Sequence, residues 1–473
     1  MKLNAIRYVY FLGIGGIGMS ALARYFQAAG KKVAGYDRTR TALTDELAAA
    51  GMEIHFEDDV KNIPAEYIAG KEKLLVVWTP ALPPDHRELN FFRDGGFTLM
   101  KRARVLGIIA ENSTTIAVAG THGKTTTTTL TAHLLRTSGI DSSAFLGGIS
   151  GNYHTNLLLG KNIAKENVPA GENILVAEAD EYDRSFHWLH PEVAIVTSAD
   201  PDHLDIYGNR NEMDESYRKF ISQVKRKLIT RRKVLDQLGI PVTEKVLTYS
   251  LEEDSSDAFA KEIRVEDGFY HFDLVIRGKK IEGLKLGLPG RHNVENAVAA
   301  VTAAKEFGIG DESVKSALAS FRGVQRRFDI HLRDPECVYI DDYGHHPAEL
   351  KACISSVREL FPGKKIAGVF QPHLYSRTRD FADEFAQSLD LLDAVFLMEI
   401  YPARELPVPG VTSSMLLGKI NVHEKCLVSD DELLEKLRRA EFDVLITMGA
   451  GNIDRFVEPV TQMLKEKIKN KTS

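Results

Sequence analysis

Short runs of apolar residues, many of them β-branched, recur along this chain, and most are followed by glycine or polar residues and then by a helical pattern. Such runs predict buried strands, and their alternation with helices predicts an α/β fold built on largely parallel sheets. The predicted strands are Arg7–Leu12, Val33–Tyr36, Leu74–Thr79, Phe97–Met100, Thr115–Ala119, Ile174–Ala177, Val193–Thr197, Val338–Ile340, Ile366–Phe370, Ala394–Glu399 and Val444–Met448.

Residues 261–288 depart from this alternation. They form short strands separated by glycines, which predicts an antiparallel segment, and a helix from about Val294 to Phe307 follows. A chain of 473 residues also exceeds what one hydrophobic core usually serves, so about three domains are expected. We predict three α/β domains, at residues 1–110, 111–322 and 323–473.

The centre of the chain carries a candidate phosphate-binding loop. The sequence GTHGKT at residues 120–125 connects the strand ending at Ala119 to a helix that runs to about Ser138. Backbone N–H groups of such a loop face an anion, the Lys124 ammonium reaches the terminal phosphates, and the Thr125 hydroxyl can bind Mg²⁺. Val118 stands where the strict pattern has its first glycine, so this is a shorter variant. ATP binding is predicted, and a chance Gly-Lys-Thr turn is the alternative.

A second glycine-rich loop, GIGGIGMS at residues 13–20, follows the first predicted strand. Its glycines and Asp37, about 20 residues further on, match the dinucleotide fingerprint. Read alone this suggests NAD, but the physics requires only a pyrophosphate at a helix N-terminus and a carboxylate near a ribose. Any nucleotide diphosphate satisfies it, and a purely structural turn is the alternative. The cations at residues 101–104 are either a solvated helix start or a ligand contact.

Carboxylates follow two strands of the central part. Residues 178–181 read Glu-Ala-Asp-Glu, at the strand end beside the phosphate loop, where a Mg²⁺–ATP site needs oxygen ligands. An acidic surface turn is the alternative. His203 lies in a stretch with two preceding aspartates and is either a second metal ligand or structural. Asn293 is either a helix N-cap or, with His292 and Asn296, a contact to an adenine edge.

Polar groups also follow the strands of the last part, at residues 341–347, 371–373 and 449–452. Ligands of open parallel sheets bind outside these carboxyl ends, so the clustering predicts a site there. Arg326 and Arg327 lie just past the domain boundary and are predicted either to reach a phosphate as domains close or to form a hinge salt bridge.

Composition narrows the function classes. A net charge of −6 argues mildly against nucleic acid as the main partner. Three scattered cysteines are too few for a disulfide framework or a zinc site. No apolar run approaches the ~20 residues of a membrane span, and no secretory signal is recognisable. We therefore expect a cytoplasmic protein with no membrane partner.

The ordered motifs GIGGIGMS, GTHGKTTT, EADEYDRSF, DPDHLDIYGN, GRHNVENA, GVQRRFD and DDYGHHP resemble those of the Mur ligases over essentially the whole chain. The resemblance implies a Rossmann-like N-terminal domain for a UDP-sugar, a P-loop ATPase-like central domain and a Rossmann-like C-terminal domain for an amino acid. It implies ATP and Mg²⁺ as cofactors and an acyl phosphate intermediate. The implied substrates are UDP-N-acetylmuramate and L-alanine, joined in peptidoglycan precursor synthesis, which removes the NAD interpretation.

The resemblance also assigns roles to individual residues. The ATP site it implies comprises Gly120, Thr121, His122, Gly123, Lys124, Thr125, Thr126, His292, Asn293, Asn296, Arg326, Arg327 and Asp342. The implied metal ligands are Thr125, Glu178 and His203. The substrate site is Gly13, Gly15, Gly16, Ile17, Gly18, Met19, Ser20, Asp37, His346, Arg377 and Arg379. Catalysis is expected from Lys124, Glu178, His203, Arg327, Asp342 and His345.

Three positions differ from the family pattern. Leu374 stands where an arginine is common, which leaves the substrate carboxylate to Arg377 or Arg379. Asn452 replaces an aspartate, and Tyr36 replaces a serine. Two other functions stay open: a recycling ligase that attaches a murein tripeptide to the same nucleotide sugar, and a non-catalytic UDP-sugar- or ATP-binding regulator.

Overall fold

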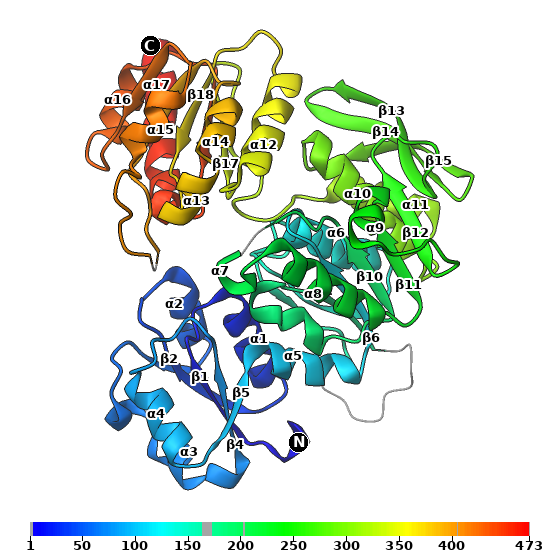
Figure 1. The fold of residues 1–473 in the computed structure, drawn as a ribbon, viewed down its shortest axis with the longest axis vertical. Coiled ribbons are helices and arrows are strands. Elements are labelled where there is room, and N and C mark those ends of the chain that lie inside the picture. The colour runs from blue at the N-terminus through cyan, green and yellow to red at the C-terminus, as the bar shows by residue number, and fades with distance from the viewer. Residues whose placement is uncertain (1–2, 163–172, 202–203, 404, 473) are drawn as a thin grey trace. The chain divides into compact units, whose positions relative to one another are not determined.

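The computed structural model describes residues 3–162, 173–201, 204–403 and 405–472. These residues form three β-sheets of five, ten and six strands (Figure 1). The chain divides into two compact units. The first comprises Met1–Lys261, Leu274–Ile281 and Asn296–Leu318, and the second comprises Glu262–Asp273, Glu282–Glu295 and Ala319–Ser473. The domain boundaries expected at residues 110 and 322 stay a prediction, because this division is into two units.

The N-terminal sheet is wholly parallel and has the strand order β3-β2-β1-β4-β5. Its strands are β1 (Tyr8–Leu12), β2 (Lys32–Tyr36), β3 (Glu53–His55), β4 (Leu74–Trp78) and β5 (Thr98–Lys101). Its helices are η1 (Leu3–Ala5), α1 (Ile17–Ala28), α2 (Ala42–Ala49), η2 (Val60–Asn62), α3 (Ala65–Ala69), η3 (Lys71–Lys73), α4 (Arg87–Asp94) and α5 (Arg102–Glu111). The order reverses between β1 and β4, and a crevice for a ligand forms outside the carboxyl ends of strands at such a point.

The central sheet has the order β15-β14-β13-β12-β11-β10-β6-β9-β7-β8. Its strands are β6 (Thr114–Ala119), β7 (Ser142–Phe145), β8 (Leu157–Leu158), β9 (Ile174–Glu178), β10 (Val193–Val196), β11 (Lys227–Thr230), β12 (Val246–Ser250), β13 (Ala258–Glu266), β14 (Phe269–Ile276) and β15 (Lys279–Leu286). Its helices are α6 (Lys124–Thr137), η4 (Tyr182–Trp188), α7 (Leu204–Tyr207), α8 (Arg210–Ser222), α9 (Arg232–Leu238), α10 (Arg291–Lys305) and α11 (Asp311–Ser320). β6 pairs in parallel with β9 and β10, so three carboxyl ends meet beside the candidate phosphate loop. The two-residue connections between β13, β14 and β15 make these strands antiparallel, as the sequence predicts.

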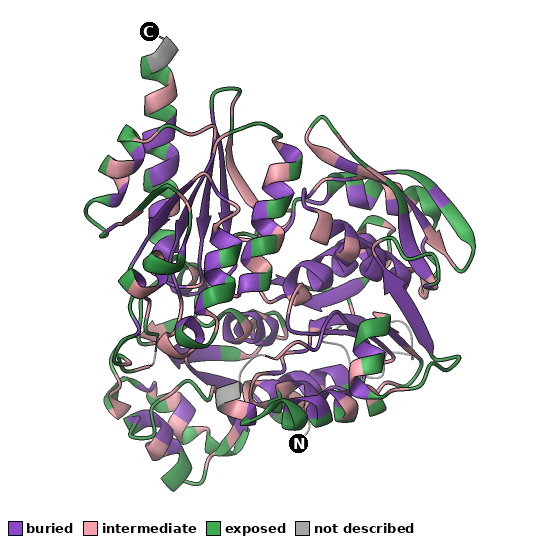
Figure 2. Cartoon of the chain, turned by 45° about the horizontal axis from the view of Figure 1, so that its top comes forward, coloured by how far each residue is buried: buried purple, intermediate pink, exposed green. Residues whose placement is uncertain are grey.

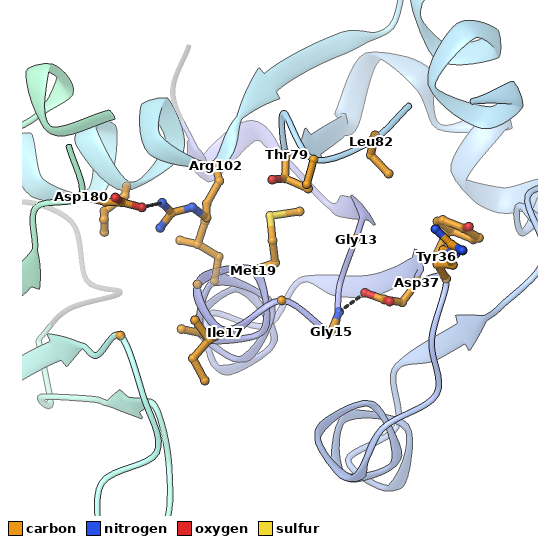
Figure 3. Close-up of a pocket in the computed structure, with 18 of the residues that line it drawn as sticks. Gly13, Gly15, Ile17, Met19, Tyr36, Asp37, Thr79, Leu82, Arg102 and Asp180 are labelled. Carbon is orange, nitrogen blue, oxygen red and sulfur yellow. Dashed lines mark hydrogen bonds and ion pairs between the residues drawn. The ribbon is translucent and has the colours of Figure 1, made fainter. Parts of the chain in front are cut away.

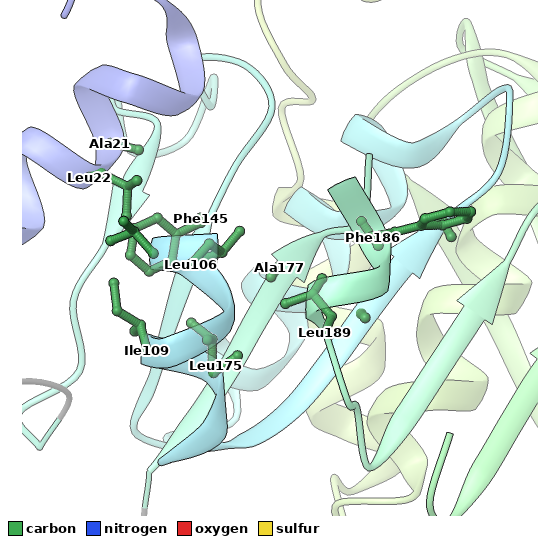
Figure 4. Packing of buried hydrophobic residues seen from close by; sticks show 14 of the residues in the cluster. Ala21, Leu22, Leu106, Ile109, Phe145, Leu175, Ala177, Phe186 and Leu189 are labelled. Atoms are coloured by element: carbon green, nitrogen blue, oxygen red, sulfur yellow. The ribbon is translucent and has the colours of Figure 1, made fainter. Parts of the chain in front are cut away.

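The first unit has a hydrophobic core that joins its two sheets. Leu22 of α1, Leu106 and Ile109 of α5, Phe145 of β7 and Leu175 of β9 belong to one buried cluster (Figure 4). A fully buried amide adds a polar bond across the same boundary. Asn156 donates through Nδ2 to the Ile17 carbonyl at 2.6 Å and to Ser20 Oγ at 2.8 Å. The glycine loop at the start of α1 is therefore fixed directly to the central sheet.

The C-terminal sheet has the order β16-β17-β21-β18-β19-β20, and only the β16–β17 pair is antiparallel. Its strands are β16 (Asp329–Arg333), β17 (Val338–Asp342), β18 (Ile366–Phe370), β19 (Ala394–Leu397), β20 (Glu424–Leu427) and β21 (Val444–Met448). Its helices are α12 (Pro347–Leu360), α13 (Tyr375–Asp380), α14 (Ala382–Leu389), α15 (Ser413–Lys419), α16 (Leu433–Arg439), η5 (Asn452–Phe456) and α17 (Val457–Thr472). β17, β18 and β21 are buried along their whole length (Figure 2), and their sequences are largely apolar apart from Thr447 and the two aspartates that end β17. Among the residues described, no helix is both long and apolar enough to cross a membrane.

A buried histidine on α6 gives a testable pH dependence. His133 is 5% exposed, and its Nδ1 lies 2.8 Å from the Tyr153 hydroxyl. Burial lowers the pKa of His133 to about 4, although the Ala317 carbonyl opposes this shift. An unfolded histidine binds its proton near pH 6.5, so the stability contributed by neutral His133 is complete above that pH and is lost as the pH falls toward 4.

We expect the His133 ring to titrate with a midpoint near pH 4 in an NMR titration of the folded protein. Its ring-proton signal is assigned as the one that the His133→Gln protein lacks. A midpoint close to 6.5 with the fold intact would contradict this reading of the α6 environment.

Candidate active site

The phosphate loop between β6 and α6 requires its glycines. Gly120 and Gly123 have φ angles of 129° and 77°, which other residues rarely adopt. A Cβ at Gly120 would lie 2.1 Å from Thr197 Oγ1, and one at Gly123 would lie 2.6 Å from Asn296 Oδ1. The loop is also bonded to the end of β10, because Ser198 Oγ accepts a bond from the His122 amide at 3.0 Å. The neighbouring strand therefore holds this loop in shape.

Lys124 lies at the start of α6 and is largely buried, with 14% of its side chain exposed. Its ammonium donates to the Gly120 carbonyl at 2.7 Å and to Glu181 Oε1 at 2.8 Å. Burial alone lowers the pKa of Lys124, but the carboxylates of Glu181, Glu178 and Asp180 outweigh it, and the net shift is upward. Lys124 therefore stays charged and available for an anion.

The carboxylates of residues 178–183, at the end of β9 and just after it, have different partners. Glu178 Oε2 would lie 2.0 Å from a Cβ on Gly147, so this carboxylate packs directly against the Gly147 backbone. Asp180 pairs with Arg102 at 3.3 Å, and Asp183 pairs with Lys101 at 2.6 Å. These carboxylates therefore do not form a solvated turn, since they bind the phosphate-loop lysine and two cations, one at the end of β5 and one at the start of α5.

Two of the three predicted metal ligands, Thr125 and Glu178, lie among the described residues. Glu178 and Thr125 provide oxygen donors of the kind that Mg²⁺ prefers, and Mg²⁺ usually takes only one or two protein ligands beside phosphate oxygens. The donor set therefore fits a magnesium ion that is bound together with ATP. His203 lies outside the described residues, and the described part of the chain holds no group of three or more His, Cys, Asp or Glu residues arranged for a metal.

A cavity of about 640 Å³ lies where the N-terminal sheet meets the central sheet, within the first unit (Figure 3). The glycine loop and Asp37 of the N-terminal part line it, and so do Gly147, Glu178 and Asp180 of the central part. The predicted substrate residues that line it are Gly13, Gly15, Gly16, Ile17, Gly18, Met19 and Asp37. Asp37 accepts a bond from the Gly15 amide at 2.7 Å. Ser20 does not line the cavity; it is fully buried and bonded to Asn156.

Arg102 is the pocket residue that sequence reasoning left undecided. It is the first residue of α5, and its guanidinium lies against Gly18, where a Cβ would be 2.6 Å from Nη1 (Figure 3). α1 begins beside it without a side-chain N-cap, so its first amides are available to an anion. The pocket therefore combines a helix N-terminus with a cation. Tyr36, Asp58, Thr79 and His86 also line it and were missed, although Thr79 directly follows β4.

The residues predicted for an adenine contact lie on the first turns of α10. Asn293 is not the N-cap that the sequence allowed, because it is the third residue of the helix and donates to the Pro289 carbonyl at 2.7 Å. Asn296 lies against Gly123 of the phosphate loop. His292 Nδ1 lies 3.3 Å from Ser356 Oγ, and burial lowers the pKa of His292 to about 4, so the ring is neutral at pH 7.

Asp342 ends β17 and is held by two backbone amides, those of Phe328 at 2.8 Å and Gly344 at 2.7 Å. Burial raises the pKa of Asp342 to about 6, although Arg327 and the two amides pull it down. Arg327 itself lies over the Tyr343 ring, with its guanidinium carbon 4.8 Å from the centroid. Asp342 and Arg327 therefore belong to one local cluster in the second unit.

Arg326 is bonded to the protein on several sides. It donates to the Gly449 carbonyl at 2.7 Å and to Asp341 Oδ2 at 3.2 Å, and Asp341 is fully buried. This placement corresponds to the salt-bridge alternative for Arg326 rather than to a phosphate contact. Its predicted ATP role stays a prediction that the geometry does not favour.

The remaining predicted residues lie after β17 and β18. His345 Nδ1 lies 3.1 Å from the Tyr343 carbonyl, and the His346 ring caps α12 by accepting from the Ala348 amide. Arg377 is 8% exposed, whereas Arg379 is exposed and paired with Asp380.

Leu374 and Asn452, the two residues in this part of the chain that differ from the family pattern, each form a hydrogen bond within the protein. Leu374 adopts a φ of 72° and donates its amide to the Tyr401 carbonyl, and Asn452 Oδ1 accepts from Gln371 Nε2 at 2.8 Å.

Three Mur ligase family models match this chain: the catalytic domain over residues 8–114, the middle domain over 118–304 and the glutamate ligase domain over 326–451. Sequence relatives include UDP-N-acetylmuramate–L-alanine ligases of Parabacteroides distasonis, 48% identical over 99% of this chain and 100% of the relative, and of Porphyromonas gingivalis, 49% identical over 97% and 99%. Among solved structures, a UDP-N-acetylmuramate–alanine ligase of Thermotoga maritima has a TM-score of 0.81 and 28% identity over 97% of this chain and 99% of that one. A murein peptide ligase of Psychrobacter arcticus, 23% identical over 97% and 98%, shares the fold with a TM-score of 0.70. This chain belongs to the Mur ligase family.

Proposed function

We propose that this protein joins L-alanine to the carboxylate of UDP-N-acetylmuramate with ATP, releasing ADP and phosphate, in peptidoglycan precursor synthesis. The observation that carries the proposal is the position of Glu178. It lines the pocket that also holds the glycine loop of α1, and its charge acts on Lys124 of the phosphate loop. The proposed sugar-nucleotide pocket and the phosphate loop therefore lie on either side of one carboxylate, that of Glu178. Such a reaction, which consumes ATP, would take place in the cytoplasm.

A carboxylate is a poor electrophile until one of its oxygens is phosphorylated. Transfer of the ATP γ-phosphoryl group makes an acyl phosphate, the amine of alanine then forms the C–N bond, and phosphate leaves with one original carboxylate oxygen. Phosphoryl transfer of this kind needs positioning and charge stabilisation rather than a protein nucleophile. The loop amides and Lys124 hold the phosphates. Mg²⁺ held by Glu178 and Thr125 would neutralise charge on them.

The amino acid would bind at the carboxyl ends of the C-terminal sheet. Asp342 ends β17 and His345 follows it, while Arg377 lies on α13, which follows β18. Arg377 is suited to the alanine carboxylate because a guanidinium binds carboxylates in a bidentate manner. A base must also take a proton from the alanine ammonium.

Within the sugar-nucleotide pocket, we assign the diphosphate to the N-terminus of α1 and to Arg102. Arg102→Gln should raise the Kd for UDP-N-acetylmuramate roughly 10- to 100-fold, because it removes a charge-assisted hydrogen bond. Isothermal titration calorimetry measures this directly. Arg104→Gln is the matched control: Arg104 is exposed on the same helix, lies over the Trp188 ring, and should have no effect. Equal affinities for wild type and Arg102→Gln would show that the diphosphate lies elsewhere.

The overall function is tested by a phosphate-release assay with ATP, Mg²⁺ and UDP-N-acetylmuramate, offering each of the twenty amino acids and a murein tripeptide. We expect release with L-alanine to exceed all others. Preference for the tripeptide would instead identify a recycling ligase, whose fold this chain shares. Binding of both nucleotides without release would identify a regulator.

A further inference from the structure

We propose that Glu181 is a positioning residue for Lys124, and that it orients the ammonium so that one N–H donor is directed to the ATP phosphates. The inference rests on the proposed function, because it assumes that ATP occupies the phosphate loop. It gives a role to Glu181, the second glutamate of residues 178–181. None of the predicted site roles includes this residue.

The first support is the geometry of the ammonium. A lysine ammonium has three N–H donors. Lys124 uses one on the Gly120 carbonyl at 2.7 Å and a second on Glu181 Oε1 at 2.8 Å. With two tetrahedral directions fixed by the protein, the third direction is fixed as well. A flexible four-carbon side chain is thereby held in one orientation before any ligand arrives, which reduces the entropy lost on binding.

The second support is burial. The Glu181 side chain is 1% exposed, and the backbone around it is fixed because its carbonyl accepts from the Tyr207 hydroxyl at 2.5 Å. A carboxylate in such a place is strongly destabilised if its counterion leaves, because water cannot replace the lost charge. Lys124 therefore keeps its bond to Glu181 when phosphate arrives and bridges the two, rather than moving from one anion to the other.

The third support is that the carboxylates of residues 178–183 bind different partners. Asp180 is paired with Arg102, and both line the sugar-nucleotide pocket, while Asp183 is paired with Lys101. Glu178 lines that pocket. Glu181 is the member of this set whose carboxylate bonds to the phosphate-loop lysine. The two glutamates, three residues apart, would thus bind different cations: Glu178 the metal ion and Glu181 the lysine ammonium.

The test is a double-mutant cycle on the binding of a non-hydrolysable ATP analogue with Mg²⁺, measured by calorimetry on the full-length protein. Glu181→Gln keeps the shape and an oxygen acceptor but removes the charge. It should weaken analogue binding roughly tenfold in the wild-type background. In a Lys124→Met background the same substitution should cause no further loss, because the residue acts only through Lys124.

Three results would overturn the inference. Tighter analogue binding by Glu181→Gln would mean that Glu181 restrains the lysine, and unchanged binding would mean that Glu181 does not act on it. An equal loss in both backgrounds would mean that Glu181 has a general structural role. UDP-N-acetylmuramate binding reports whether each variant is folded. Should Glu181→Gln fail that check, Glu181→Asp takes its place and should weaken analogue binding in the wild-type background alone. Wild-type protein that binds no analogue would instead refute the proposed function itself.

Discussion

Replacing Lys124 by methionine should lower the ATP-dependent release of phosphate by roughly 10²- to 10³-fold or more. Lys124 is the cation of the phosphate loop, and it lies largely buried, where its charge is little screened by water. Its loss removes stabilisation of the charge that develops on the transferred phosphoryl group. The effect should appear in kcat as well as in KM for ATP, since this charge is greatest in the transition state.

The matched control is Lys225→Met, which removes an exposed lysine paired with Glu192 in the same unit and should leave turnover unchanged. The Lys124→Met protein should also unfold at a lower temperature, because the buried Glu181 carboxylate loses its counterion. The double variant Lys124→Met/Glu181→Gln should regain part of that loss but none of the activity. More than a tenth of wild-type turnover in Lys124→Met would show that the loop does not hold the reacting phosphates.

Glu178→Gln should have the second largest effect. The amide keeps the size of the side chain but loses the charge that Mg²⁺ requires, so kcat should fall roughly 100-fold. The Mg²⁺ concentration that gives half-maximal activity should rise. Affinity for UDP-N-acetylmuramate should change far less, since the diphosphate is assigned to the α1 glycine loop and Arg102 rather than to Glu178.

Glu215→Gln serves as the control for this variant, because Glu215 is an exposed carboxylate on α8 paired with Arg218. Calorimetry on the sugar nucleotide and a Mg²⁺ titration of activity separate the two effects. A Glu178→Gln protein with an unchanged Mg²⁺ requirement but lost sugar-nucleotide affinity would assign Glu178 to substrate binding instead of metal binding.

Local patterns were sufficient to predict much of the fold. Each apolar run proposed as a strand overlaps a strand of the structure, and the helix predicted after GTHGKT corresponds to α6. Of the strands in the described residues, β3, β7, β8, β11, β12, β16 and β20 were not predicted. The edge strands β3, β8 and β20 are brief or only partly buried, so their sequences carry little alternation. Glycine spacing identified both candidate anion-binding loops, since a tight approach of backbone to backbone leaves room only for glycine.

Contacts between residues far apart in the chain were not predictable from the sequence. Arg102 was left between a solvated helix start and a ligand contact, and only its closeness to Gly18 and Asp180 places it in the pocket. The bond from Asn156 to the first turn of α1 spans more than 130 residues and has no local signal. The pairing of Lys124 with Glu181 depends on two loops meeting at the ends of adjacent parallel strands.

The most direct test of the proposed reaction follows the oxygen atoms of the substrate carboxylate. UDP-N-acetylmuramate labelled with ¹⁸O at both carboxylate oxygens is incubated with the protein, ATP, Mg²⁺ and L-alanine, and the released phosphate is analysed by mass spectrometry. Activation of the carboxylate through an acyl phosphate predicts one ¹⁸O in each phosphate released and one in each amide formed. Amide formation accompanied by unlabelled phosphate would contradict it.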